Sequence, residues 1–238
     1  MTQPLLNVEN LGKRFGGFIA VDGVSLSVAP GERVGLIGPN GSGKSTFVNC
    51  VGGAFARYDG LVAFGGRDLA GLPPYRRVRL GLARTFQLPR AFASLTVLEN
   101  VEVPFRFLDA GGGPTSERAR DQLERVGLAG KARLRPRDLT QVDLRRLELA
   151  RALACRPKLL VADEAMAGLS HAEVDDILEL LLGANADGVA IVMIEHIMRA
   201  VTAFAERLVV FVAGRKIADG PTPEVLRRKD VEAAYLGE

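Results

Sequence analysis

The chain has 238 residues, of which 47% are hydrophobic and 25% are charged, as in an ordinary soluble globular protein. Its 31 basic and 28 acidic residues leave a net charge of only +3, which excludes a large basic field. The longest apolar runs, Val189 to Ile194 and Leu208 to Ala213, are far shorter than the roughly 20 residues that span a bilayer. We therefore expect any membrane-spanning part to be supplied by other chains.

Two clusters of arginine occur, at positions 76, 77 and 79 and at positions 133, 135 and 137. We expect both clusters to be solvated faces, and a contact surface for a partner or for lipid headgroups is the alternative. No aromatic residues interleave with these arginines in the way that base stacking requires. Nucleic acid is therefore not an expected partner.

The first predicted elements are short strand-like pieces separated by Gly-rich turns, which indicate a small antiparallel sheet. These pieces are Leu6 to Glu9, Phe18 to Val21, Val24 to Val28 and Leu61 to Phe64. Continuous apolar runs follow further along the chain and predict strands buried on both faces of a mainly parallel sheet. The runs are Arg33 to Ile37, Leu159 to Ala162, Val189 to Ile194 and Leu208 to Ala213.

Helical patterns lie between the buried strands. Ser170 and Glu173 form a capping box before apolar residues at helical spacing. Residues 88–157 read mostly as helix, interrupted by the linker Gly111, Gly112, Gly113 and Pro114. We predict one α/β domain, in which residues 1–87 and 158–238 form the core with its antiparallel β subdomain and C-terminal tail. Residues 88–157 are predicted to form a helical insertion.

Residues 38–45 read Gly-Pro-Asn-Gly-Ser-Gly-Lys-Ser, which fits the phosphate-loop pattern between a strand and a helix. Glycines let the backbone turn tightly and direct its N–H groups at phosphate oxygens, beside the positive end of the following helix. Lys44 supplies a positive charge for the β- and γ-phosphates, and the Ser45 hydroxyl is a ligand for Mg²⁺. The predicted ATP-binding residues here are Gly38, Pro39, Asn40, Gly41, Ser42, Gly43, Lys44, Ser45 and Thr46.

An acidic pair ends the apolar strand at residues 159–162 and resembles a Walker B element. Asp163 is the predicted Mg²⁺ ligand, directly or through water, and Glu164 is the predicted base that polarises the attacking water. His196 follows another strand and is a candidate contact to the γ-phosphate, although a structural histidine is the alternative. Gln87 lies where the core gives way to the helical insertion, and its amide is a candidate contact to Mg²⁺ or the water.

The order of these elements resembles that of ABC-type ATPases over nearly the whole chain. The resemblance implies that Phe15, in Lys13-Arg14-Phe15-Gly16, stacks on adenine, and a core phenylalanine is the alternative. A finer resemblance is to the LivG-like ATPase subunits of branched-chain amino acid importers. The segments that carry it are 84–87 with 95–100, 146–151, 167–169 and the ending 234–238. The ATPase of the lipopolysaccharide exporter shares that ending, whereas Arg-Thr-Phe-Gln at 84–87 favours the importer group.

The family's signature, Leu-Ser-Gly-Gly-Gln, is replaced here by Leu-Thr-Gln-Val-Asp at 139–143. Thr140 can replace the serine hydroxyl, but Gln141 and Val142 replace glycines that let backbone N–H groups approach the γ-phosphate. Asp143 adds a negative charge there unless an arginine such as Arg145 or Arg146 neutralises it. Two hypotheses follow: this signature serves a weakened ATP site in an asymmetric pair, or it is a working variant of the subfamily.

The resemblance also implies the partners. It implies a head-to-tail pair of ATPases beneath two membrane permease subunits, at the cytoplasmic face of a bacterial inner membrane, with an extracytoplasmic solute-binding protein acting indirectly. The second ATPase is a different chain or a copy of this one. A groove near Gln87 to Asn100 is expected to receive a helix of a membrane subunit. The alternatives are a lipopolysaccharide-type exporter ATPase, a soluble ABC protein that does not transport, and a scaffold that does not hydrolyse ATP.

Overall fold

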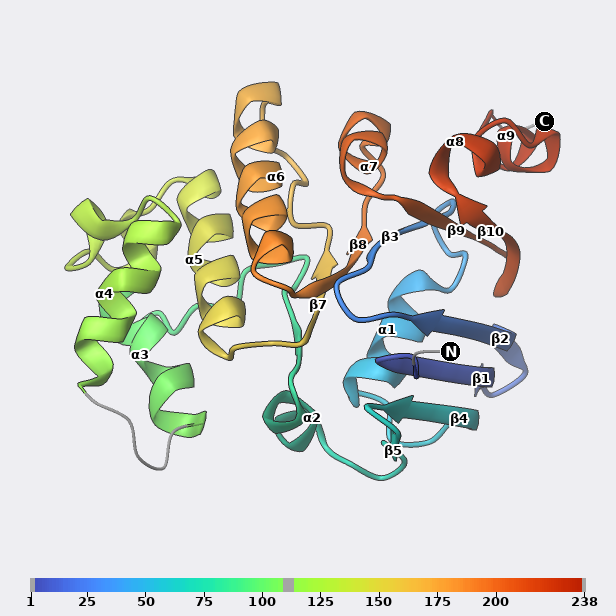
Figure 1. The fold of residues 1–238 in the computed structure, drawn as a ribbon, viewed down its shortest axis with the longest axis horizontal. Helices are drawn as coiled ribbons and strands as arrows, with labels where there is room; N and C mark the ends of the chain where they lie inside the picture. Colours follow the sequence, from blue (N-terminus) through green and yellow to red (C-terminus); the bar gives the residue numbers. More distant parts are fainter. Residues whose placement is uncertain (1–2, 109–113, 237–238) are drawn as a thin grey trace.

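The computed structural model describes residues 3–108 and 114–236, which fold into an α/β structure with two sheets (Figure 1). Within these residues the core sheet has the strand order β10 (Arg215–Pro221), β9 (Arg207–Val212), β3 (Arg33–Ile37), β8 (Ala190–Ile194), β7 (Leu159–Asp163) and β6 (Leu82–Arg84). The pairing is parallel from β9 to β6, and only β10 runs antiparallel to its neighbour. The predicted mainly parallel core is therefore confirmed.

The core strands are apolar without interruption because both faces of the sheet are covered. Val161 and Val192 pack on the side of α1 (Lys44–Gly52) and the antiparallel sheet. Their neighbours Leu160 and Ile191 pack on the other side, against α6 (His171–Ala186) and α7 (Met198–Phe204). Figure 1 shows α6 and α7 on one side of this sheet and α1 on the other. The predicted capping box of Ser170 and Glu173 is confirmed at the start of α6.

The antiparallel sheet has the order β2 (Phe18–Val28), β1 (Leu6–Phe15), β4 (Asp59–Phe64) and β5 (Arg67–Asp68). One prediction was wrong here, because Phe18 to Val21 and Val24 to Val28 belong to a single strand. The register of β1 and β2 shifts between the pairs Leu11–Val24 and Lys13–Val21. Gly23, with φ of 61°, lies in this shift, so the glycine marks a β-bulge and not a turn.

The helices of the middle segment pack around a core of their own. That core includes Val97, Val101, Leu123 and Leu147. These helices are α3 (Val97–Leu108), α4 (Thr115–Arg125) and α5 (Gln141–Ala154), with short 3₁₀ turns at Ala129–Lys131 and Pro136–Asp138. The preceding helix, α2 (Pro74–Leu80), packs its Leu80 against the main core instead. In Figure 1, α3, α4 and α5 lie together at one end of the molecule. The boundaries at 87/88 and 157/158 stay a prediction.

Two predicted features fall partly outside the described residues. Gly111, Gly112 and Gly113 of the linker lie there, while Pro114 directly precedes α4. The chain ends in α8 (Thr222–Val225) and α9 (Lys229–Leu236), and Gly237 and Glu238 of the family-like ending lie outside the described part. No helix within the described part is long and apolar enough to cross a membrane.

One of the arginine clusters is not the solvated face that the sequence predicted. Arg76 and Arg79 are exposed, but Arg77 is only 1% exposed. Its guanidinium donates to four backbone carbonyls, two at the end of α1 and two in the loop before α2. Arg77 is therefore an internal link between α1 and α2, and no partner or lipid headgroup can reach it.

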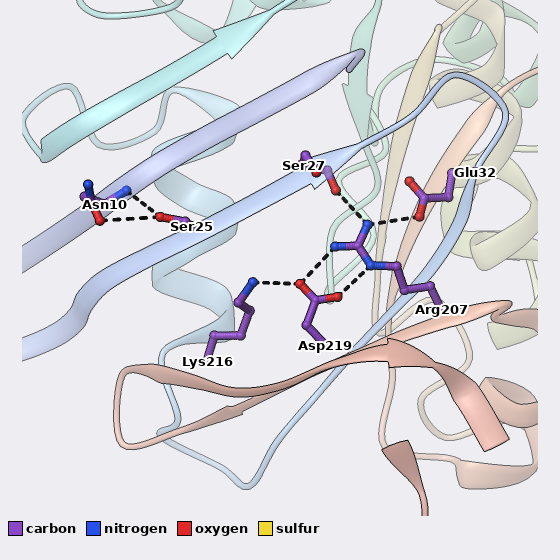
Figure 2. Close-up of polar contacts among 7 residues, drawn as sticks. All are labelled: Asn10, Ser25, Ser27, Glu32, Arg207, Lys216 and Asp219. Carbon is purple, nitrogen blue, oxygen red and sulfur yellow. Dashed lines mark hydrogen bonds and ion pairs between the residues drawn. The ribbon is translucent and has the colours of Figure 1, made fainter. Parts of the chain in front are cut away.

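A polar network joins the two sheets where β2 leaves the antiparallel sheet (Figure 2). Arg207 donates twice to Asp219, at 2.6 and 2.9 Å, and once each to Glu32 and to the carbonyl of Ser27. Lys216 also donates to Asp219, at 2.7 Å. Burial works to raise the pKa of Asp219, but the hydrogen bonds and charges of Arg207 and Lys216 outweigh it and hold this pKa below its usual value.

Candidate functional site

The predicted site residues converge because four neighbouring parallel strands end at one edge of the core sheet. The phosphate loop follows β3, and His196 lies just beyond β8. Asp163 is the last residue of β7 and Glu164 follows it, while Gln87 lies three residues beyond β6. The carboxyl ends of parallel strands are where open α/β sheets bind ligands. Segments that are far apart in the sequence thus meet in one place.

The phosphate loop needs its glycines for space as well as for conformation. Gly43 has φ of 100°, and a Cβ there would come within 2.4 Å of the Ala20 carbonyl oxygen on β2. A Cβ on Gly38 would come within 2.2 Å of the Phe211 carbonyl oxygen on β9. Only glycine fits either position without moving a neighbouring strand. The loop is therefore packed between β2 of the antiparallel sheet and β9 of the core sheet, and it leads directly into α1.

Lys44 folds back over the loop. Its Nζ donates to the carbonyls of Gly38, at 2.7 Å, and Pro39, at 3.0 Å, with Ser42 Oγ at 3.4 Å. Burial lowers the pKa of Lys44, and the nearby Glu164 and Asp163 carboxylates oppose that shift. The ammonium is thus held by neutral acceptors that a phosphate would outcompete. Among the other predicted loop residues, Asn40, Gly41 and Ser45 are exposed, Thr46 is half-buried and Ser42 is 2% exposed.

Asp163 is a buried carboxylate that forms an ion pair with the Arg84 guanidinium. Its Oδ2 lies 3.0 Å from Arg84, and its backbone N–H donates to Thr85 Oγ1. Burial raises the pKa of Asp163; Glu164 adds to this, while Arg84 and Lys44 oppose it. The oxygens that the sequence assigned to Mg²⁺ are a hydroxyl, a carboxylate and an amide, from Ser45, Asp163 and Gln87. Such a hard oxygen set fits Mg²⁺.

Glu164 is held in an unusual backbone conformation. Its φ is 45°, in the left-handed region that L-residues rarely adopt, and its N–H donates to the Ile194 carbonyl at the end of β8. Its side chain accepts a hydrogen bond from Gln87 Nε2 at 2.6 Å, measured to Oε2. The predicted base and the glutamine predicted to contact Mg²⁺ or the water therefore touch each other directly in this structure.

His196 and its neighbour Glu195 differ sharply in exposure. The His196 side chain is 64% exposed, as a residue that meets a ligand should be, whereas the Glu195 side chain is fully buried. Glu195 Oε1 accepts the backbone N–H of Met166, and its Oε2 lies 3.9 Å from His196 Nδ1. Burial raises the pKa of Glu195. This buried acid connects the histidine to the loop that follows Glu164.

Phe15 ends β1 and is 45% exposed, so it is not the core phenylalanine of the alternative interpretation. Its ring meets the edge of Phe55 at a centroid distance of 5.3 Å, and Lys13 Nζ lies 5.0 Å from the Phe15 ring centroid. The β1–β2 hairpin carries Ala20, which contacts the phosphate loop at Gly43. An exposed, fixed aromatic ring on this hairpin suits stacking on a base.

The signature segment begins α5, and the charge of Asp143 is neutralised, which is one of the two alternatives that the sequence left open. Thr140 is the N-cap, with a capping box in which Asp143 is the third helical residue. The Asp143 side chain is only 3% exposed and pairs with Lys131 at 2.5 Å, so the neutralising residue is neither Arg145 nor Arg146. Gln141 is exposed and donates to the Ala167 carbonyl, and Val142 is half-buried.

The sequence did not predict the contacts of three charged residues of this site, although it had offered Arg145 as a neutraliser of Asp143. Arg84 pairs with Asp163, Glu195 supports Met166, and Arg145 on α5 donates to the carbonyls of Gln87 and Ala167. Glu195 had a usable signal, because it directly extends an uninterrupted buried strand. The other two have no local signal, since their partners are distant in sequence.

A phosphate loop, an acidic pair and a histidine at the carboxyl edge of a parallel sheet define an ATPase of the P-loop class. The chain belongs to the ABC transporter family, whose model, described as ABC transporter, matches residues 21–167. It is 38% identical to the high-affinity branched-chain amino acid transport ATP-binding protein LivG of Escherichia coli (strain K12), over all of both chains. It is 40% identical to the corresponding protein BraF of Pseudomonas aeruginosa, again over all of both chains.

The fold also matches solved structures of the family. A crystal structure of MJ1267, an ATP-binding cassette of an ABC transporter, in its ADP conformation superposes with a TM-score of 0.88. The two sequences are 33% identical, and the match covers all of both chains. The predicted family and fold are therefore confirmed.

Proposed function

We propose that this chain is the ATP-binding and ATP-hydrolysing subunit of an importer for branched-chain or related amino acids or small amides. The observation that carries the ATPase part is the meeting of Lys44, Asp163, Glu164, Gln87 and His196 at one sheet edge. The importer part is supported by identity over the full length to LivG and BraF, which are branched-chain amino acid transport ATP-binding proteins.

The chain's own residues perform the phosphate chemistry as follows. The N–H groups of the loop and the Lys44 ammonium bind the β- and γ-phosphates, for which Lys44 leaves the loop carbonyls. Glu164 accepts a proton from the attacking water after its bond to Gln87 loosens. His196, exposed at the end of β8, orients the γ-phosphate and the water. Phe15 stacks on adenine.

Mg²⁺ belongs to the same proposal. Ser45, Asp163 and Gln87 would hold it, and it would neutralise charge on the phosphates. Arg84 balances the Asp163 charge in the structure described here, so Asp163 would have to loosen this pair in order to hold Mg²⁺. Asp163 is kept in place during that change by the bond from its N–H to Thr85 Oγ1.

We further propose that two ATPases pair head to tail, so that Thr140, Gln141, Val142 and Asp143 face the ATP of the second subunit. Thr140 and Asp143 shape the start of α5 through the capping box, and Thr140 and Gln141 are exposed there while Val142 is half-buried. The second ATPase is a different chain or a copy of this one. Nucleic acid is not among the proposed partners.

Two membrane permease subunits are the proposed direct partners, at the cytoplasmic face of the inner membrane of a bacterium. A pocket of about 240 Å³ lies between α2, α3 and α5, with Pro74, Phe86 and Pro104 in its lining. Large exposed side chains occur on the same elements and on the segment after Gln87, namely Tyr75, Leu88, Phe92 and Phe107. This surface suits a helix from a permease, and an extracytoplasmic solute-binding protein would act only through the permeases.

Lys44→Ala tests the ATP site. The variant should lose most ATP affinity and hydrolysis because the loop keeps its shape but loses its charge for the γ-phosphate. Lys158→Ala is the matched control, since Lys158 is exposed and directly precedes β7, at the opposite edge of the sheet. Unchanged ATPase in the assembled transporter of the Lys44 variant would remove this site assignment.

Co-purification from gently solubilised native membranes tests the importer part. Two permeases together with a second ATPase are expected to accompany the chain. Membrane subunits of lipopolysaccharide export, with this chain as the sole ATPase, would overturn the importer proposal while leaving the ATPase intact.

A further inference from the structure

Arg145 lies on α5 and is only 8% exposed, yet it contacts two separate segments of the catalytic edge. One nitrogen of its guanidinium donates to the Gln87 carbonyl at 2.5 Å, and another donates to the Ala167 carbonyl at 3.2 Å. Gln87 follows β6 and Ala167 follows β7, so 80 residues separate the two acceptors in the sequence. One side chain therefore fixes the distance between two loops.

Both loops also meet at Glu164. The Gln87 side chain donates to the Glu164 carboxylate, and the backbone N–H of Ala167 donates to the Glu164 carbonyl at 3.3 Å. The contacts close a ring that runs from Glu164 to Gln87, Arg145 and Ala167 and back to Glu164. In this ring Arg145 is the only member from the helical segment. Its place therefore decides where Gln87 sits relative to the proposed base.

The ring requires the planar guanidinium of arginine. A guanidinium presents several N–H donors at fixed angles, so it bridges two carbonyls at once, whereas a lysine ammonium is a single compact charge. Burial of a charge is costly, and the surrounding acids Glu195, Glu148 and Glu164 offset that cost. A helix that needed only packing would carry an apolar residue at this buried position.

The same face of α5 holds the segment after Gln87. Glu148 accepts the backbone N–H of Arg90, and Arg151 donates to the Arg90 carbonyl at 2.6 Å. Positions 145, 148 and 151 are spaced by three residues, so they lie along one side of the helix. Displacement of α5 would thus carry residues 87–90 with it.

We propose that Arg145 is a positioning residue that makes α5, the 87–90 segment and the loop at 165–168 move as one unit around Glu164. The proposal rests on the ATPase function argued above and adds a route by which a displacement of α5 reaches Glu164. Through this route the contact of Gln87 with Glu164 changes whenever α5 moves. Arg145 acts through its hydrogen bonds to the carbonyls of Gln87 and Ala167.

Hydrogen exchange of the purified full-length chain tests the proposal, with and without Mg²⁺ and a non-hydrolysable ATP analogue. In the natural protein, the analogue should protect residues 38–46 and change exchange in peptides covering 85–90 and 165–169 together. Arg145→Met should keep the protection at 38–46, with affinity within about threefold. It should lose the joint response of the other two peptides.

Arg146→Met is the matched control, because Arg146 neighbours Arg145 on α5 but pairs with Asp176 on α6. This variant should keep the joint response. A joint response that survives in Arg145→Met overturns the inference, whereas an absence of protection at 38–46 in the natural protein overturns the proposed function instead. If Arg145→Met does not fold, Arg145→Lys decides: a folded lysine variant that keeps the joint response also overturns the inference.

Turnover in the assembled transporter gives a second readout. Mispositioning of Gln87 and Glu164 should lower kcat in Arg145→Met by up to about 10²-fold, while KM for ATP changes by less than about threefold. Equal losses of kcat and ATP affinity would indicate a general structural role and would contradict the positioning role.

Discussion

Replacement of the buried Arg77 by methionine should unfold the chain at a markedly lower temperature. Arg77 donates at 2.7 to 2.9 Å to the carbonyls of Leu72, Cys50, Val51 and Leu69. Hydrogen bonds from a charged donor are each worth about 1.5–3 kcal/mol, and buried carbonyls left unpaired are costly. A methionine side chain fills part of the space but donates no hydrogen bond.

The loss of stability is smaller than the sum over four hydrogen bonds, because two of the four carbonyls still accept a hydrogen bond from another donor. Cys50 O also accepts from the Gly53 N–H, and Leu69 O also accepts from the Leu72 N–H. We therefore expect Arg77→Met to lower the free energy of unfolding by about 4 kcal/mol. For a chain of this length that corresponds to a fall in Tm on the order of 10 °C.

Thermal and urea unfolding of the purified chain, followed by circular dichroism, measure both quantities. Arg76→Met is the control, because Arg76 is exposed on the same helix and its loss should change stability by less than about 0.5 kcal/mol. If Arg77→Met unfolds within about 1 kcal/mol of the natural protein, the buried hydrogen bonds do not stabilise the link between α1 and α2.

Three further predictions concern catalysis and pH. Glu164→Gln should bind ATP and favour the closed pair while losing hydrolysis, measured as ATP turnover beside nucleotide affinity; turnover at the normal rate would place the base elsewhere. The double change Gln141→Gly with Val142→Gly should bring no gain in ATPase, because it removes the hydrogen bond that Gln141 donates to the Ala167 carbonyl. A gain would show that the natural signature is weakened. Asp219→Asn should cost about 2 kcal/mol at pH 7. The folded pKa of Asp219 lies below its ordinary value of 3.8. The difference in the free energy of unfolding between the two proteins, measured by urea titration, should therefore be present above pH 3.8 and disappear as the pH falls through the folded pKa.

The elements that the sequence predicted best are those in which local pattern and burial agree. β3 has the predicted bounds, β7 and β8 differ from the predicted runs by one residue at one end, and β9 is shifted by one residue at both ends. The edge strands β6 and β10 were not predicted. β6 has only three residues, and β10 is mostly half-buried or exposed, so neither carries the continuous apolar run of a central strand.

Charged residues were harder to interpret than apolar ones. Arg77 was predicted to be part of a solvated cluster, and Asp143 was predicted to add a negative charge beside a phosphate unless Arg145 or Arg146 neutralised it. Both are buried, because Arg77 finds carbonyls at the end of α1 and Asp143 finds Lys131, which lies twelve residues earlier. A charge is buried only where partners compensate it, and those partners come from other elements.

The sequence by itself determined the family and the fold class, because phosphate binding requires glycines, a lysine and a helix start within a few consecutive residues. Continuous apolar runs likewise determined the buried strands. Only the tertiary structure decided which side chains meet at the sheet edge: Arg84 with Asp163, Gln87 with Glu164, and Arg145 between two loops. These contacts join residues that are 58 to 79 positions apart, except for the 22 between Arg145 and Ala167. Such pairs depend on strand order and helix packing, which a local pattern of residues does not contain.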